Sequence, residues 1–267
     1  MLPIGSYVKK GDVIAYCGSS GRSPEPHIHF QLQSTPFVGS KTLKYPISYY
    51  VRNQNGKYFF HSFDYPQENQ SVSKIFTTRL LREAFYFIPG AKMNFSVKSN
   101  SDSIENINWE IFVDAYNQSY IYCHKTKSSA YFVNNETLHY FTDFYGDKNS
   151  LLYYFYLGAH KILLGYYHEM EIQDRLPITN FYSGVSKLIQ DFIAPFYIYL
   201  KADYKMTFAK IDDVMNPSVI EIQSSAIASI GGITKRKINF SLLMKDNKIF
   251  SFVITENNKT IVAECFG

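Results

Sequence analysis

Apolar and polar residues alternate along most of the chain with the period of two that is typical of β-strands. Short alternating or apolar runs predict strands at residues 93–97, 109–116, 120–122, 131–133, 151–157, 204–211, 219–223, 238–244, 249–255 and 260–266. The polar tetrapeptides at 245–248 and 256–259 separate the last three of these strands and predict hairpin turns. The pattern therefore favours a mainly β fold built as a meander.

In one segment the spacing of apolar residues changes from that of a strand to that of a helix. Apolar residues recur at helical spacing after residue 183, and the proline at 195 is expected to end or kink the helix; the apolar positions are Val185, Leu188, Ile189, Phe192 and Ile193. We expect about one helix in a β-rich domain of unknown family over residues 57–267, and a division of this region near residue 175 is an open alternative. The Asn-Gln-Asn-Gly sequence at 53–56 is a turn signal and separates this domain from a first domain at residues 1–52.

The first domain contains two histidines spaced for one face of a strand. In a strand over residues 27–33, alternate side chains point the same way, so His27 and His29 would lie side by side. Gln31 and Gln33 would share their face, and Ile28, Phe30 and Leu32 would anchor the other face in a core. Imidazoles in this arrangement can bind zinc or act on the charge that develops during hydrolysis.

Three pieces of sequence around these histidines resemble the carboxyl-terminal part of the M23 (lysostaphin or LytM-type) zinc peptidases. They are VKKGDVI at 8–14, GSSGRS at 18–23 and PHIHFQ at 26–31, and the resemblance covers residues 1–50 only. It implies a portion of a β-rich barrel-sandwich (duplicated hybrid) fold and a metalloendopeptidase that hydrolyses peptides of peptidoglycan outside the cytoplasm. Matched by position, His29 resembles the zinc ligand and His27 the catalytic histidine.

The resemblance begins in the middle of the family's domain. That family also binds zinc through an earlier His-x-x-x-Asp pair, and no histidine precedes His27 here. Catalytic zinc sites use three protein ligands, so we expect the isolated chain to be inactive. The remaining ligands, and any membrane anchor, would have to lie upstream of Met1 or on another chain; a late reading-frame start is a further possibility.

Composition sets the remaining limits. The chain of 267 residues is 46% hydrophobic, which is enough to bury a core, and its formal charge is only +4. The densest basic cluster is the KRK sequence at 235–237, so we expect no nucleic-acid binding. Three cysteines without CxxC spacing predict no metal knuckle and at most one disulfide. No apolar run has the length of a spanning helix, and no signal peptide pattern opens the sequence.

Aromatic residues are unusually frequent, with 23 Tyr and 22 Phe. Such rings on a sheet can stack against sugars or peptides, or they can form a core, and we expect core packing for most of them. The other polar candidates are expected to be ordinary surface or hydrogen-bonded residues; they are His61 with Asp64, His124, His139, His160, His168 with Glu169 and Glu171, and Asp212 with Asp213. A second hypothesis follows: a non-catalytic β-domain that binds cell-wall material or a partner and retains a degenerate peptidase remnant.

Overall fold

The computed structural model describes residues 2–3, 5–9, 11–19, 24–28, 30–99 and 104–266. The chain divides into two compact units, Met1–Ile47 and Ser48–Gly267. The second unit begins four residues before the end of the first domain expected from the sequence. Each unit is described by itself below.

The described part of the first unit contains little regular structure. Strand β1 (Leu32–Gln33) pairs with β2 (Thr42–Leu43), and residues 24–28 form no strand. The expected core anchors Ile28, Phe30 and Leu32 are exposed. The prediction of one continuous strand with a buried face over residues 27–33 is therefore wrong for the described positions, because no second layer covers these side chains within the unit.

The second unit opens with a small three-stranded sheet. Strands β3 (Ile47–Gln54) and β4 (Lys57–Asp64) are joined at the predicted turn, where Asn55 and Gly56 both have positive φ. Strand β5 (Ser71–Ser73) pairs with the other edge of β3. The turn signal at 53–56 is thus confirmed as a hairpin inside the second unit.

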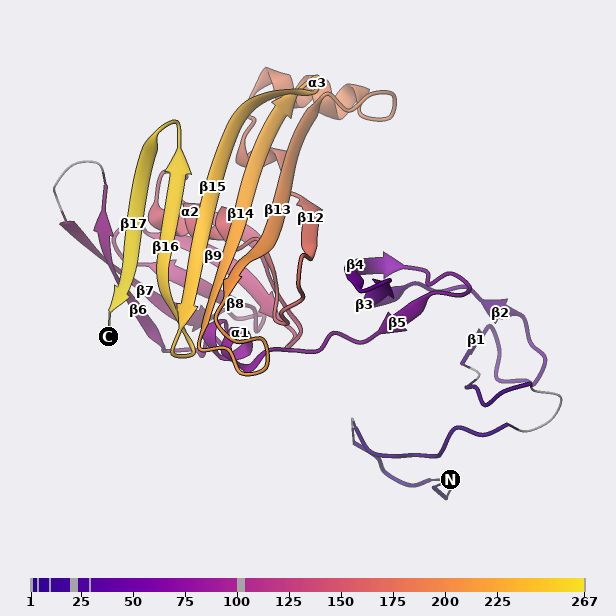
Figure 1. Ribbon diagram of the computed structural model, residues 1–267. Helices are drawn as coiled ribbons and strands as arrows, with labels where there is room; N and C mark the ends of the chain where they lie inside the picture. The colour runs from indigo at the N-terminus through magenta and orange to yellow at the C-terminus, as the bar shows by residue number, and fades with distance from the viewer. Residues whose placement is uncertain are drawn as a thin grey trace. The chain divides into compact units, whose positions relative to one another are not determined.

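A twelve-stranded antiparallel sheet forms the body of the second unit and confirms the mainly β fold class (Figure 1). Its first six strands are β6 (Lys92–Lys98), β7 (Ile104–Val113), β8 (Ser119–Cys123), β9 (Ser128–Asn134), β10 (Leu138–Tyr145) and β11 (Lys161–Leu163). The other six are β12 (Glu171–Arg175), β13 (Leu200–Ile211), β14 (Val219–Ile230), β15 (Ile233–Lys245), β16 (Lys248–Glu256) and β17 (Lys259–Phe266). Each half is a meander, and pairing of β6 with β17 joins them into one sheet that continues past residue 175.

The sheet curls into a nearly closed barrel. Its two edge strands are β11 and β12, and the Lys161 ammonium on β11 lies 2.6 Å from a carboxylate oxygen of Asp174 on β12. The hydroxyl of Tyr204 also donates to the carbonyl oxygen of Lys161, 3.3 Å away. Side-chain contacts therefore hold together the two edges that lack a backbone ladder.

Helix α2 (Leu151–Gly158) packs against the inner face of the barrel strands, and Figure 1 shows it within the curve of the sheet. The expected strand over residues 151–157 is therefore wrong. A short, wholly apolar run has the same sequence pattern in a buried strand and in a helix that is covered on all sides. Ser150 caps the helix, because its hydroxyl accepts a hydrogen bond from the backbone N–H of Tyr153 at 3.2 Å.

Two further α-helices are present in the described residues, where about one was expected: α1 (Arg79–Ala84) and α3 (Val185–Ile193), with a 3-10 turn at Ile178–Asn180. The helix predicted from the spacing after residue 183 is α3. None of the helices in the described ranges is long and apolar enough to cross a membrane.

The predicted hairpin turns at 245–248 and 256–259 are confirmed. Asp246 and Asn247 have φ values of 51° and 61°, and Asn257 and Asn258 have values of 47° and 65°. Two successive positive φ values define the type I′ turn that matches the twist of paired strands, and Asn and Asp tolerate it better than other side chains.

Candidate functional site

The histidine pair predicted from the sequence is only partly visible. His27 is exposed, and its Nδ1 donates to the carbonyl oxygen of Glu25 at 2.9 Å. His29, the expected zinc ligand, lies outside the described residues. Among the side chains that the structure describes, no three His, Cys, Asp or Glu residues converge in a group that could hold a metal ion. The described residues thus do not assemble the ligand set that the M23 resemblance implies, and we assign no zinc-dependent step to them.

The other polar candidates mostly have structural roles. His61 Nδ1 lies 2.7 Å from Asp64, and His124 Nε2 lies 2.8 Å from Glu110. The hydroxyl of Ser218 and the backbone N–H groups of Ser218 and Val219 donate hydrogen bonds to Asp212, and together they lower the pKa of its carboxyl group to about 2. These are turn and surface interactions, as expected from the sequence. The three cysteines, Cys17, Cys123 and Cys265, are free, so the one disulfide left open by the sequence is not formed.

Glu171 and His168 do not share a site. The Lys205 ammonium bonds to Glu171, and this contact is the largest cause of the lowered pKa of the Glu171 carboxyl group. His168 Nε2 instead lies 3.5 Å from Glu169, on the exposed surface. His168 and Glu169 lie on the solvated surface as expected, whereas the expectation of a surface position is wrong for His160, which is buried at 8% exposure.

Four aromatic rings cross strands β7 to β10 on the face opposite the core, and we call Phe112, Tyr120, Tyr131 and Tyr145 the aromatic ladder. Phe112 and Tyr120 stack with centroids 5.8 Å apart, and Tyr120 and Tyr131 stack at 5.0 Å. Tyr145 meets Tyr131 edge to face at 5.8 Å. The ladder follows from strand alternation, because the neighbouring Ile111, Ile121 and Ala130 point inward and are buried.

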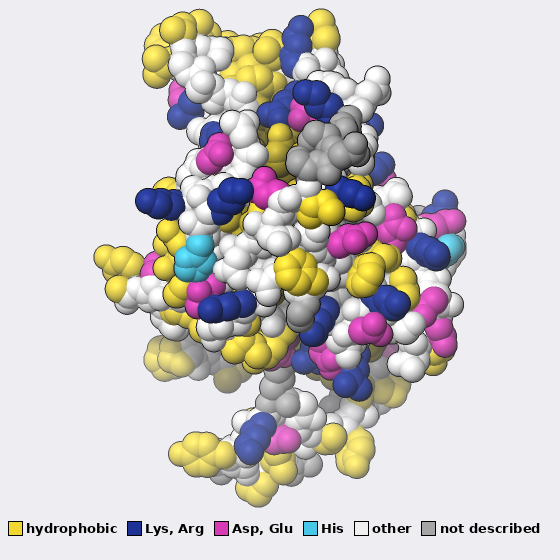
Figure 2. Space-filling view, turned by 90° about the vertical axis from the view of Figure 1, so that its left-hand side faces the viewer, with side chains coloured by type: hydrophobic (Ala, Val, Ile, Leu, Met, Phe, Trp, Pro, Cys, Tyr) yellow, Lys and Arg dark blue, Asp and Glu magenta, His cyan; other side chains and the backbone are white. Residues whose placement is uncertain are grey.

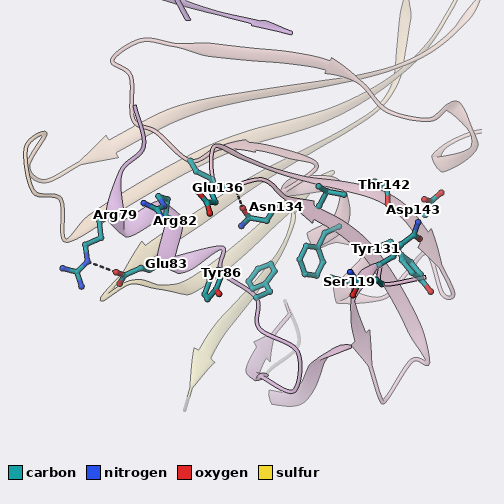
Figure 3. Close-up of a pocket in the computed structure, with 16 residues that line it drawn as sticks. Arg79, Arg82, Glu83, Tyr86, Ser119, Tyr131, Asn134, Glu136, Thr142 and Asp143 are labelled. Atoms are coloured by element: carbon teal, nitrogen blue, oxygen red, sulfur yellow. Dashed lines mark hydrogen bonds and ion pairs between the residues drawn. The ribbon is translucent and has the colours of Figure 1, made fainter. Parts of the chain in front are cut away.

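A cleft of about 980 Å³ begins where the ladder reaches Tyr131 (Figure 3). Helix α1, the segment that follows it, the turn before β8, and strands β9 and β10 supply its walls. Tyr86, Phe87, Tyr131 and Phe132 provide aromatic surface in this lining. A cleft of this size that combines aromatic surface with many polar and charged side chains can hold a polar ligand.

Polar groups line both ends of the cleft (Figure 3), and the charged side chains of α1 stand at one of these ends. The Asn134 side chain is fixed, because its Nδ2 donates to the carbonyl oxygen of Phe85 at 2.9 Å and its Oδ1 accepts from the N–H of Glu136 at 2.9 Å. Arg79 pairs with Glu83 at 2.6 Å (Figure 3). Arg82 is exposed and forms no ion pair with any residue in the described ranges, which leaves a guanidinium that can bind a carboxylate.

A buried histidine supports the aromatic floor of this cleft. His139 is fully buried, and its ring lies 5.0–5.4 Å from those of Phe85, Phe87, Phe132 and Phe141. Neither ring nitrogen has a hydrogen-bond partner among the described residues, in contrast to the expectation of a hydrogen-bonded core histidine. Burial lowers the pKa of His139 to about 3, so the ring is neutral at ordinary pH and acts as one more packed ring.

Sequence reasoning identified the strands that carry Tyr120 and Tyr131 but missed the cleft. Tyr86, Asn134 and Glu136 fall in the segment after α1 and at the end of β9, and no spacing in the sequence relates them to each other. Only the non-local pairing of the sheet brings these segments together.

The chain was compared with protein-family models, curated proteins and solved structures. No family model matches the chain, and no curated protein and no solved structure is significantly similar to it.

Proposed function

We propose that the second unit is a non-catalytic binding module that holds a cell-wall glycopeptide along the aromatic ladder and in the adjoining cleft. The observation that carries the proposal is the continuity of the two features at Tyr131, which belongs to both. The ladder offers continuous aromatic surface for the C–H groups of sugar rings, and Arg82 and the fixed Asn134 offer polar partners for a peptide stem. This is the second of the two hypotheses drawn from the sequence.

The proposal predicts that Tyr131→Ala weakens binding of soluble peptidoglycan fragments roughly tenfold, since one aromatic contact that is made only in the complex is worth about 1.4 kcal/mol or more. Isothermal titration of the full chain with muropeptides measures the effect. Phe250→Ala is the matched control, because Phe250 is a partly exposed ring on strand β16, which does not line the cleft. Equal affinity of wild type and Tyr131→Ala would exclude the ladder and cleft as the binding surface.

The three motif pieces of the first unit support a second candidate function: the carboxyl-terminal portion of an extracytoplasmic M23-like zinc metalloendopeptidase that acts on peptidoglycan peptides. It predicts that the chain as given binds far less than one equivalent of zinc after dialysis. Elemental analysis of the dialysed chain tests this, and near-stoichiometric zinc would contradict the assignment of His29 as a lone ligand.

Joining an M23 amino-terminal half with an intact His-x-x-x-Asp to this chain should restore zinc binding and peptide hydrolysis. In that fusion His29→Ala should abolish zinc binding, whereas His27→Ala should retain zinc and lose most of the activity. Equal loss of zinc in both variants would contradict the division of roles between the two histidines.

A further inference from the structure

Helix α3 presents its apolar side away from the protein. Leu188 and Phe192 are 68% and 84% exposed, and Val185 and Ile189 lie on the same side of the helix and are also exposed. The helix's one fully buried residue is the polar Gln190, at 3% exposure. A helix that packs on a globular core normally has the opposite arrangement, so within the second unit the apolar side of α3 is left uncovered.

Specific hydrogen bonds hold the helix in this orientation. The Gln190 side-chain oxygen accepts from the backbone N–H groups of Tyr199 and Leu200 at 2.8 and 2.9 Å. Its amide nitrogen donates to the carbonyl oxygen of Tyr197, and the Tyr199 hydroxyl donates to the carbonyl oxygen of Ser186. The polar side is thus attached to the start of β13, and the apolar side is left in solvent.

The apolar surface continues beyond the helix. Phe196, Tyr197 and Ile198 follow it and are exposed, as is Ile233 at the tip of the β14–β15 hairpin. The hairpin tip lies beside the end of this segment, because the N–H of Gly231 donates to the carbonyl oxygen of Tyr199 at 2.8 Å and Leu200 pairs with Ile230. We call this surface, formed by α3, residues 196–198 and Ile233, the apolar tip.

Basic residues surround the apolar tip. Residues 183–203 and 229–237 contain five basic and two acidic side chains, and Glu256 bonds to Arg236 among them, so this surface carries a formal charge of +2. Lys201, Lys235 and Lys237 are exposed and form no ion pair within the described ranges. Figure 2 shows hydrophobic side chains gathered at the end of the molecule where Figure 1 places α3, with Lys and Arg side chains next to them.

We propose that the apolar tip binds the surface of an anionic lipid bilayer, with α3 lying in the interface and the lysines contacting lipid headgroups. An amphipathic helix with exposed Phe, Leu and Ile and flanking cations is the arrangement that binds such interfaces. The excess positive charge selects an anionic membrane over a second copy of this chain, which would bring the same positive charge against itself.

Flotation of the full chain with vesicles tests the proposal. The chain should float with vesicles of phosphatidylglycerol and phosphatidylcholine in equal parts, should bind phosphatidylcholine vesicles much less, and should be released by high salt. The double variant Leu188→Asp, Phe192→Asp should bind at least about tenfold more weakly, because charged side chains replace the inserted apolar ones. Both positions are exposed, so circular dichroism should show an unchanged fold.

Met215→Asp is the matched control, because Met215 is 91% exposed and lies in the connection between β13 and β14, away from the apolar tip in sequence and in strand register. It should float like wild type, and Lys235→Glu with Lys237→Glu should lose the preference for anionic vesicles. Wild-type chain that stays unbound with both kinds of vesicle would overturn the proposal. A second result would also overturn it: no vesicle binding, together with a dimer detected by light scattering that the Leu188→Asp, Phe192→Asp variant no longer forms. The apolar tip would then bind a second copy of this chain.

Discussion

Replacing Phe155 by alanine should lower the free energy of unfolding by about 3–5 kcal/mol, the usual cost of removing a buried ring whose cavity cannot fully collapse. Phe155 is fully buried on α2, and its ring lies 5.2 Å from Trp109, 5.8 Å from Phe141 and 5.5 Å from Phe252. These partners stand on β7, β10 and β16. One ring therefore connects the inner helix to both meanders of the sheet.

Chemical denaturation of the full chain, followed by far-UV circular dichroism, measures this loss. Phe250→Ala serves as the control, because Phe250 is partly exposed and the substitution should cost far less. If β12–β17 unfolded in a separate transition that Phe155→Ala left unchanged, the view of the barrel as one cooperative unit around α2 would be wrong.

Acid should destabilise the barrel through its two buried histidines. Burial lowers the pKa of His139 to about 3 and that of His160 to about 4, whereas a histidine in the unfolded chain titrates near 6.5. Below roughly pH 6.5 the unfolded state therefore binds protons that the folded state excludes. Above that pH the two histidines do not lower the free energy of unfolding. As the pH falls below it, each imidazole lowers the free energy of unfolding by about 1.4 kcal/mol per pH unit, until the pH reaches the pKa of that histidine in the folded state.

His139→Leu should remove one of these two contributions. At neutral pH the variant should stay within about 1.5 kcal/mol of wild type, because the replacement is similar in volume and eliminates two unpartnered ring nitrogens. Between roughly pH 6.5 and 4.5 it should lose about 1.4 kcal/mol less per pH unit than wild type. Carboxylates contribute equally to both proteins, so the difference isolates His139. Parallel pH profiles would contradict a neutral, buried His139.

Local sequence patterns were sufficient to predict the hairpin turns and most of the strands of the second unit. The paired positive φ values at Asn257 and Asn258 follow from the Asn-Asn sequence, and the alternation around Tyr204 and Phe252 reflects one face buried inside the barrel. The same reasoning failed for α2, because a helix enclosed by a barrel needs no polar side and loses the period that identifies helices. It also gave no sign that α3 would turn its apolar side outward, since spacing alone cannot tell which side of a helix is covered.

The candidate site was less accessible to sequence reasoning than the fold. Rings such as Tyr120 and Tyr131 could be recognised as strand residues, but their stacking depends on the register between β8 and β9. The cleft requires α1 to lie beside the end of β9, a contact fixed by the hydrogen bond from Asn134 to Phe85. Such long-range contacts leave no local pattern. The zinc assignment of His29 stays a prediction.

Hydrogen–deuterium exchange of the full chain, with and without soluble peptidoglycan fragments, tests the proposed binding function most directly. Bound fragment should slow exchange in the cleft segments, at residues 82–87, 117–119 and 131–136, and along the ladder strands β8 to β10. Exchange in the β13–β16 strands should stay unchanged. Slowed exchange confined to residues 1–47, or none anywhere at saturating fragment, would contradict a binding site on the barrel.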